Sequence, residues 1–269
     1  MRIFLKIFIL ILSTHTHAKC EFKKEIQRLI SLSGSSTVLL KDFGLLKSPV
    51  VKGVSVFNPI TNSDFTGKIY PGGIFISHQE LKGLEKSIVL YDENRELRRI
   101  FDSHPSITSR EIKTRSLAPA ETVEATLSTL SEFIVGCDEE IIRLNKKVKD
   151  LQQEILKKIP TRRTMIFYLG AFIGDRAPQM VMANDGIVKW LVDEKKIFTY
   201  PTELAYVNWS TKIIQALPRE AIHIALKDSG RNGERNVMKS SDRITLIYPG
   251  LLVPGLSQLE AFLFLITAI

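Results

Sequence analysis

DEEIIRLNKKVKDLQQEILKKI, residues 138–159, has the pattern of one uninterrupted amphipathic helix. Its apolar side chains recur at alternating spacings of 3 and 4, which places them on one helical face; they are Ile141, Leu144, Val148, Leu151 and Ile155. Acidic residues open the segment, Lys157 and Lys158 close it, and Pro160 ends it, which suits the helix dipole and the helix stop signal. By itself such a helix fits a short coiled coil or an ordinary surface helix.

The segments on either side of this helix favour a more specific architecture. Strand-like and helix-like stretches alternate before it and again after it, a pattern typical of parallel sheets covered by helices. We expect strands at 27–33, 50–56, 87–91 and 111–116, with helices at 37–43, 77–84, 94–102 and 119–135. After the long helix we expect strands at 164–169, 220–227 and 243–248, helices at 185–194 and 210–217, and a buried helix within 254–269.

These patterns predict an α/β fold of two Rossmann-like lobes with parallel sheets, bridged by one long α-helix. The predicted divisions are a signal peptide (1–18), an N-terminal lobe (19–136), the bridging helix (137–160) and a C-terminal lobe (161–269).

The first residues have the organisation of a cleavable secretory signal peptide. Arg2 and Lys6 flank a short apolar run at 3–12, and small residues precede a cleavage position after Ala18. The apolar run is too short to span a membrane. We therefore expect a secreted, periplasmic protein.

The chain contains two cysteines, Cys20 and Cys137. In an oxidising compartment an even pair commonly forms a disulfide, so we predict a bond between them, with two free thiols as the alternative. Such a bond joins the mature N-terminus to the start of the long helix.

The formal net charge is +8. The Lys and Arg residues are scattered and form no run with interleaved aromatics, so the charge indicates a solvated surface and no nucleic-acid partner. The same excess of cations favours an anionic ligand over a cationic one.

Several short motifs, taken in order, carry a resemblance to a known family. They are RLISLS at 28–33 followed by a Ser/Thr-rich helix start, the segment 78–90, and STKIIQALPREAIHI at 210–224. In this order they resemble the periplasmic binding proteins whose lobes are bridged by a long helix (class III), which serve ABC importers of cobalamin, ferric siderophores and haem. Gly34 stands where that family usually has a proline.

The resemblance implies a monomeric protein that captures a metal chelate between its lobes and delivers it to an ABC transporter permease at the inner membrane. Docking in that family uses an acidic residue on each lobe. Glu96 matches the first-lobe position, whereas the second-lobe position holds Thr211. The sequence does not distinguish a ferric siderophore, haem and cobalamin.

Candidate binding residues follow the strands, because ligands of doubly wound sheets approach the carboxyl ends of strands. We predict ligand contacts from both lobes, namely Ser33, Ser35, Tyr70, Tyr91, Phe172, Arg176, Trp209 and Tyr248. Phe57, Asp175 and Asp228 occupy comparable positions. Aromatic rings in such places stack on flat ligands, and Arg176 is suited to bind carboxylates. Ordinary loop packing is the alternative for each of them.

Other functions have less support in the sequence. A related branch of the fold binds bare zinc or manganese, but the mature chain keeps only His78, His104 and His223, too few for a typical site. GxSxG, P-loop and HExxH motifs are absent, so we expect neither an enzyme nor a bound cofactor. A secreted helix-bridged binding or scaffold protein without a transport ligand remains the second hypothesis.

Overall fold

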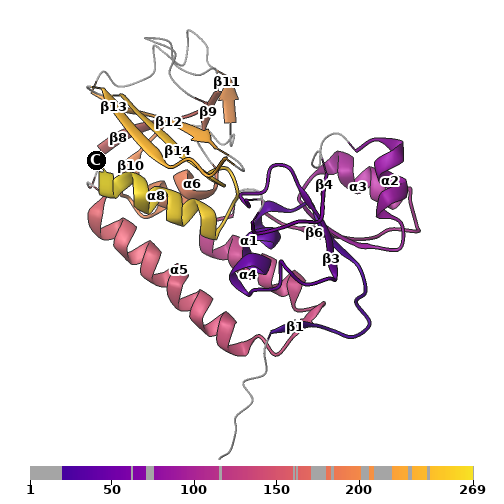
Figure 1. The fold of residues 1–269 in the computed structure, drawn as a ribbon. Helices are drawn as coiled ribbons and strands as arrows, with labels where there is room; N and C mark the ends of the chain where they lie inside the picture. The colour runs from indigo at the N-terminus through magenta and orange to yellow at the C-terminus, as the bar shows by residue number, and fades with distance from the viewer. Residues whose placement is uncertain are drawn as a thin grey trace, which may run out of the picture.

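A single long helix, α5 (Asp138–Lys158), runs along two α/β lobes (Figure 1). The structure is a computed structural model that describes residues 20–61, 63–70, 76–114, 117–159, 161, 163–170, 180–182, 185–200, 206–208, 220–229, 232–240 and 243–268. Leu144, Val148 and Ile155 of α5 are buried, while Ile141 and Leu151 pack half-buried beside them. The apolar face predicted from the sequence is therefore the face that contacts the rest of the protein.

The first lobe contains a parallel sheet in the order β4-β3-β2-β5-β6. Its strands are β2 (Leu29–Ser31), β3 (Val51–Ser55), β4 (Lys68–Tyr70), β5 (Ile88–Asp92) and β6 (Thr108–Ile112). The helices of this lobe are α1 (Gly34–Asp42), α2 (His78–Leu84), α3 (Arg95–Asp102) and α4 (Pro119–Leu130). Ser77 and Glu80 form the predicted capping box of α2, and Pro119 begins α4.

Both faces of this sheet are covered, as alternating side chains on buried strands require. Leu29, Leu90 and Ile112 belong to the cluster that includes α1 and α4. Their neighbours Ile30 and Val89 belong to a second cluster with α2 and α3. The α1/α4 face is the one that continues into the second lobe.

The second lobe has a mixed sheet, not the purely parallel one that the sequence predicts. β8 (Arg163–Leu169), β12 (Ile222–Asp228), β14 (Arg243–Tyr248) and β10 (Ile197–Phe198) are parallel to their partners. β9 (Met180–Met182), β11 (Tyr206–Asn208) and β13 (Asn236–Ser240) pair antiparallel. These short strands extend a parallel centre at its edges.

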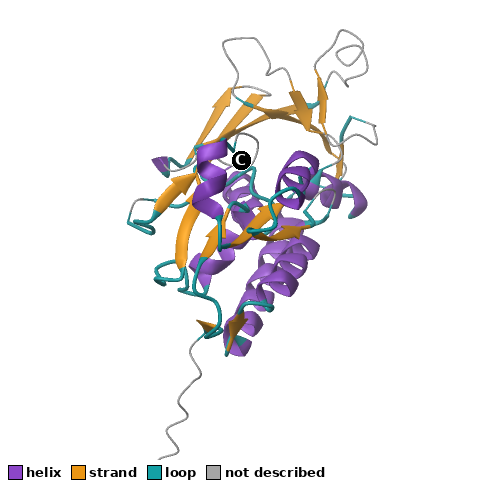
Figure 2. Ribbon diagram, turned by 90° about the vertical axis from the view of Figure 1, so that its right-hand side faces the viewer, coloured by secondary structure: helices purple, strands orange, loops and turns teal. Residues whose placement is uncertain are grey.

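Two helices of the second lobe line the side that faces α5. They are α6 (Gly186–Asp193) and the C-terminal α8 (Leu256–Ala268). In Figure 2 the strands of the second lobe lie above those of the first, with the helices gathered between and beside them. Among the described residues, no helix, α8 included, is long and apolar enough to cross a membrane.

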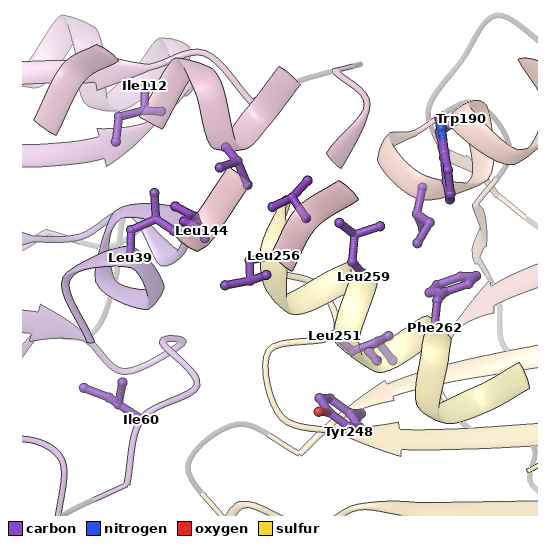
Figure 3. Packing of buried hydrophobic residues seen from close by; sticks show 14 of the residues in the cluster. Leu39, Ile60, Ile112, Leu144, Trp190, Tyr248, Leu251, Leu256, Leu259 and Phe262 are labelled. Carbon is purple, nitrogen blue, oxygen red and sulfur yellow. The ribbon is translucent and has the colours of Figure 1, made fainter. Parts of the chain in front are cut away.

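One continuous apolar core connects the lobes. Figure 3 shows Leu39 and Leu144 on one side and Leu256, Leu259 and Phe262 of α8 leading to Trp190 on the other. Because α8 contacts α1, α4 and α5, the second lobe is held to the first by packed side chains as well as by the bridging helix.

A disulfide between Cys20 and Cys137 is present, as predicted. Beside it, β1 (Glu21–Phe22) and β7 (Ile134–Val135) form a small antiparallel ribbon. Both cysteines are buried. The bond and the ribbon together fix the start of the described chain at the N-terminal end of α5.

The predicted elements agree with the structure in kind, with shifts at their ends. β6 lies at Thr108–Ile112 because it pairs in parallel with β5, and α4 ends at Leu130, which leaves residues 134–135 for β7. β4 lies within a segment that the sequence suggests is only turns. The helix predicted at 210–217 lies outside the described residues.

Candidate ligand-binding cleft

A cavity of about 470 Å³ lies where the carboxyl ends of the first-lobe strands meet the second lobe. Residues at or just after the ends of β2, β3 and β5 form one wall, and the second lobe contributes the last residue of β12 and residues that precede α8. The described lining consists of Leu32, Gly34, Ser55, Val56, Phe57, Asn58, Asp92, Glu93, Asn94, Leu97, Asp228, Leu252, Val253 and Pro254. This is the edge of the sheet at which ligands of doubly wound folds bind, and the volume is typical of small-molecule sites.

Exposed apolar side chains from both lobes border the cavity. Phe57 is 64% exposed and Val56 is 40% exposed at the end of β3, and Leu252 of the opposite lobe is 42% exposed. Large apolar side chains that stay open to solvent at a concave site commonly mark a binding surface. Phe57, which follows β3, is therefore an exposed aromatic side chain at the border of the cavity.

Asp92, the last residue of β5, organises the first-lobe wall. Its carboxylate accepts hydrogen bonds from Ser33 Oγ (2.6 Å), Ser35 Oγ (3.1 Å) and the Gly34 backbone N–H (3.0 Å). Desolvation by the surrounding protein raises the pKa of Asp92, and these three hydrogen bonds act in the opposite direction. Asp92 therefore ties β5 to the first turn of α1, which Ser33 caps by accepting from the Ser36 N–H.

Asp228, the last residue of β12, likewise holds part of the cavity wall in the second lobe. Its two carboxylate oxygens accept from the backbone N–H groups of Gly250 (3.1 Å) and Leu252 (3.2 Å). These contacts hold the loop between β14 and α8, which carries the apolar cavity residues 252–254. The sequence position of Asp228 suggests a ligand contact, and the structure shows that its carboxylate also builds the wall.

The β14–α8 loop packs directly on the first lobe. A Cβ atom on Gly34 would lie 2.8 Å from one Val253 methyl carbon and 2.9 Å from the other. Gly250 adopts a φ of 71° beside Pro59 of the first lobe, a conformation that glycine tolerates best. The absence of a side chain at Gly34 thus leaves room for Val253.

Ser33 and Ser35, two of the predicted contact residues, lie at the cavity edge but are buried and bonded to each other and to Asp92. Their hydroxyl groups help to hold the wall in place, because both donate hydrogen bonds to Asp92. Direct contact of either serine with a ligand stays a prediction.

The structure assigns Tyr70, Tyr91 and Tyr248 to the interior of the lobes, which corrects their expected place on the cavity wall. They are 1%, 3% and 6% exposed, respectively, and none is among the described lining residues of this cavity. The Tyr91 ring packs on Phe101 with centroids 5.0 Å apart, and the Tyr248 ring packs on Phe264 at 5.5 Å. The reason is geometric: a side chain near the end of a strand points above or below the sheet, under a helix, and not past its edge.

The remaining predicted positions divide into two groups. Phe172, Arg176 and Trp209 lie outside the described residues, as do Asp175 and Thr211. Glu96 lies in the first turn of α3 with its side chain 64% exposed, 3.5 Å from Arg99. Its exposure is compatible with docking to a partner, which stays a prediction.

The described lining of the cavity contains neutral polar side chains and acidic ones. The charged residues in its described lining are Asp92, Glu93 and Asp228, and that part of the lining contains no Lys, Arg or His. The formal charge of +8 does not by itself argue for an anionic ligand at this described part of the lining. Within the described ranges, no group of three or more His, Cys, Asp or Glu side chains is placed to hold a metal ion.

Comparisons with known proteins add evidence for the fold. No protein-family model and no curated protein sequence matches the chain. Among solved structures, it is similar to the periplasmic heme-binding protein RhuT from Roseiflexus sp. RS-1, with a TM-score of 0.61, 14% identity, and coverage of 90% of this chain and 97% of that chain. It is likewise similar to the periplasmic heme binding protein HutB of Vibrio cholerae, with a TM-score of 0.63, 13% identity, and coverage of 90% and 98%.

The chain has the fold of the helix-bridged periplasmic binding proteins. A periplasmic heme binding protein from Pseudomonas aeruginosa gives a similar result, with a TM-score of 0.60, 14% identity, and coverage of 88% of this chain and 91% of that chain. The predicted two-lobe, helix-bridged fold is therefore confirmed. At these identities the likeness establishes the fold, and the ligand has to be argued from the cleft.

Sequence reasoning missed two features of this helix-bridged cleft. Asp92 follows the strand-like run SIVLY directly, so its place at a strand end could have identified it. The second-lobe residues 252–254 follow no predicted strand end closely enough to be singled out. They reach the cleft because α8 packs on α1 and α4.

Proposed function

We propose that this protein is an extracytoplasmic binding protein that captures a flat metal chelate, of the haem type, and delivers it to an ABC importer. The observation that carries the proposal is the cavity of about 470 Å³ between the lobes, bordered by exposed apolar side chains from both of them. A largely apolar slot between two sheets suits a planar macrocycle, which buries both of its faces at once.

The choice of haem over other chelates rests on two arguments. The similar structures named above are described as heme-binding proteins. In addition, Phe57 and Leu252 offer apolar contact from opposite lobes, as a porphyrin plane needs. A ferric siderophore or cobalamin is the alternative within the same function, and these bulkier, more polar ligands fit this slot less well.

The partner and location follow from the same proposal. Binding, and not catalysis, is the activity of the similar proteins as they are described. The signal-peptide pattern at 1–18 and the disulfide agree with a periplasmic location. Glu96, exposed on α3, is the proposed first-lobe contact with the permease.

Titration with iron(III) protoporphyrin IX tests the proposal. Absorbance and fluorescence quenching should show saturable binding to the purified mature protein. Phe57→Ala should weaken binding about five- to thirtyfold. A stacked ring contributes roughly 0.5–1.5 kcal/mol of binding free energy beyond that from the apolar area that it buries. Leu252→Ala should weaken it less.

Phe198→Ala is the matched control. Phe198 is 58% exposed on β10 and is absent from the described cavity lining, so its removal should leave haem affinity unchanged. Equal losses in both Phe variants would indicate nonspecific adsorption of haem. Saturable binding of free zinc or manganese with no response to haem would favour the bare-metal function.

A further inference from the structure

The helix N-terminus that faces the cavity is already occupied by a protein carboxylate. α1 directs its first N–H groups toward the cavity edge, where such groups attract an anion. Asp92 takes this place, with its carboxylate 3.0 Å from the Gly34 nitrogen and 2.6 Å from Ser33 Oγ. The Gly34 N–H and the Ser33 hydroxyl group therefore already have a protein acceptor, and a ligand carboxylate at this turn would have to compete with Asp92 for them.

Glu93 adds a second carboxylate to the same wall. It lines the cavity next to Asp92, and within the described part of the chain its side chain has no hydrogen bond or ion pair. The nearby Arg98 does not neutralise it by pairing, because Arg98 binds Glu111, with Nε 3.3 Å from one carboxylate oxygen and a second bond from Nη2. The hydrogen bond to Glu111 is also the main reason that the pKa of Arg98 is raised, with the charge of Glu93 a smaller contribution.

We propose that Glu93, supported by Asp92, makes the first-lobe wall of the cleft exclude anionic groups, so that a ligand binds with its carboxylates toward the second lobe or the solvent. The inference rests on the proposed function and refines it. It predicts a ligand with carboxylates confined to one edge, so that an apolar edge can face the first lobe. Like charges brought together in a site of low dielectric repel strongly enough to select among ligands in this way.

Two iron porphyrins separate the possibilities. Iron(III) protoporphyrin IX carries its propionates on one edge, so it can turn them away from the first lobe. Iron(III) coproporphyrin I carries one propionate on each of its sides, so any orientation brings one against this wall. The native protein should bind protoporphyrin at least tenfold more tightly, as measured by absorbance titration at low and moderate salt.

Glu93→Gln should strengthen coproporphyrin binding. The ratio of protoporphyrin affinity to coproporphyrin affinity should therefore fall by about three- to tenfold. It should change protoporphyrin affinity by a smaller factor than coproporphyrin affinity, because protoporphyrin can turn its propionates away from this wall. Glu85→Gln is the matched control: Glu85 is an exposed glutamate that precedes β5, at the opposite edge of the same sheet, and its substitution should not alter this ratio.

The outcomes are distinguishable. Equal binding of the two porphyrins by the native protein, or a ratio of affinities that Glu93→Gln leaves intact, overturns the inference while the proposed function stands. Failure of the native protein to bind either porphyrin overturns the proposed function and this inference with it.

Discussion

Asp92 and Asp228 occupy equivalent places in the two lobes, each as the last residue of a central strand, but they hold different structures. Asp92 anchors the first turn of a helix through two hydroxyl groups and one backbone N–H. Asp228 anchors a loop through two backbone N–H groups. The comparison teaches that polar residues at strand ends can build the walls of a cleft, while apolar neighbours such as Phe57 and Leu252 stay exposed at its border.

The lobes also differ in covalent support, and breaking that difference should have the largest effect. The Cys20–Cys137 bond closes a loop of 117 residues around the first lobe. Cys20→Ser with Cys137→Ser should lower the free energy of unfolding by about 4–5 kcal/mol, since the open chain gains entropy when unfolded. Urea denaturation measures this effect, and peptide mapping that finds two free thiols in the native protein would contradict it.

Removing each strand-end carboxylate tests whether the two are equally important. Asp92→Ala should destabilise the protein by about 2–4 kcal/mol, because three donors near the cavity lose their partner. Asp228→Ala should cost about 1–2 kcal/mol, since its two partners lie in a loop that water can reach. Chemical denaturation of both variants gives the order, and the reverse order would show that the loop depends more on its anchor than α1 does.

The pH dependence of the free energy of unfolding tests whether the pKa of Asp92 is raised in the folded protein. Desolvation raises its pKa in the folded protein above the ordinary value of 3.8, so the folded state binds the proton more tightly than the unfolded state. The resulting stabilisation is present at low pH and is lost as pH rises from 3.8 through the folded pKa. The free energy of unfolding of the native protein should therefore fall relative to Asp92→Asn over that window, and a constant difference would argue against the raised pKa.

The contact between the lobes at Gly34 can be tested with a double-mutant cycle. Gly34→Ala should destabilise the protein by about 1–2 kcal/mol, because the added methyl group meets the Val253 methyl groups. Val253→Ala should make the same substitution nearly neutral, which gives a coupling energy between the lobes. Additive effects would mean that the β14–α8 loop moves away without cost.

The smallest effect is expected at two lysines that occupy matching turns. Lys86 follows α2 with a φ of 57°, and Lys195 follows α6 with a φ of 55°. Because a side chain disfavours this left-handed conformation and glycine does not, each Lys→Gly substitution should stabilise the protein by about 0.5–1 kcal/mol. Thermal unfolding of the two single variants and of the double variant measures the increase in stability. Equal increases would indicate that the backbone strain at Lys86 and at Lys195 is similar.

The sequence alone was sufficient to predict the long helix, the helix starts and the disulfide. The spacing of apolar residues in 138–159 predicts α5 and its buried face, since helical periodicity depends only on neighbours along the chain. The capping box of α2 and the proline at the start of α4 are local for the same reason. The disulfide was predictable because the chain offers one possible pair.

Tertiary structure decided what depends on distant segments. Whether a strand-end tyrosine faces a ligand or a helix depends on which helix covers that face of the sheet, and Tyr91 meets Phe101 of α3. The second-lobe wall of the cleft exists because α8 packs on α1 and α4, bringing Val253 against Gly34 across more than 200 residues of chain. Side-chain periodicity carries no information about such contacts, since they are set by how whole helices and sheets share one apolar core.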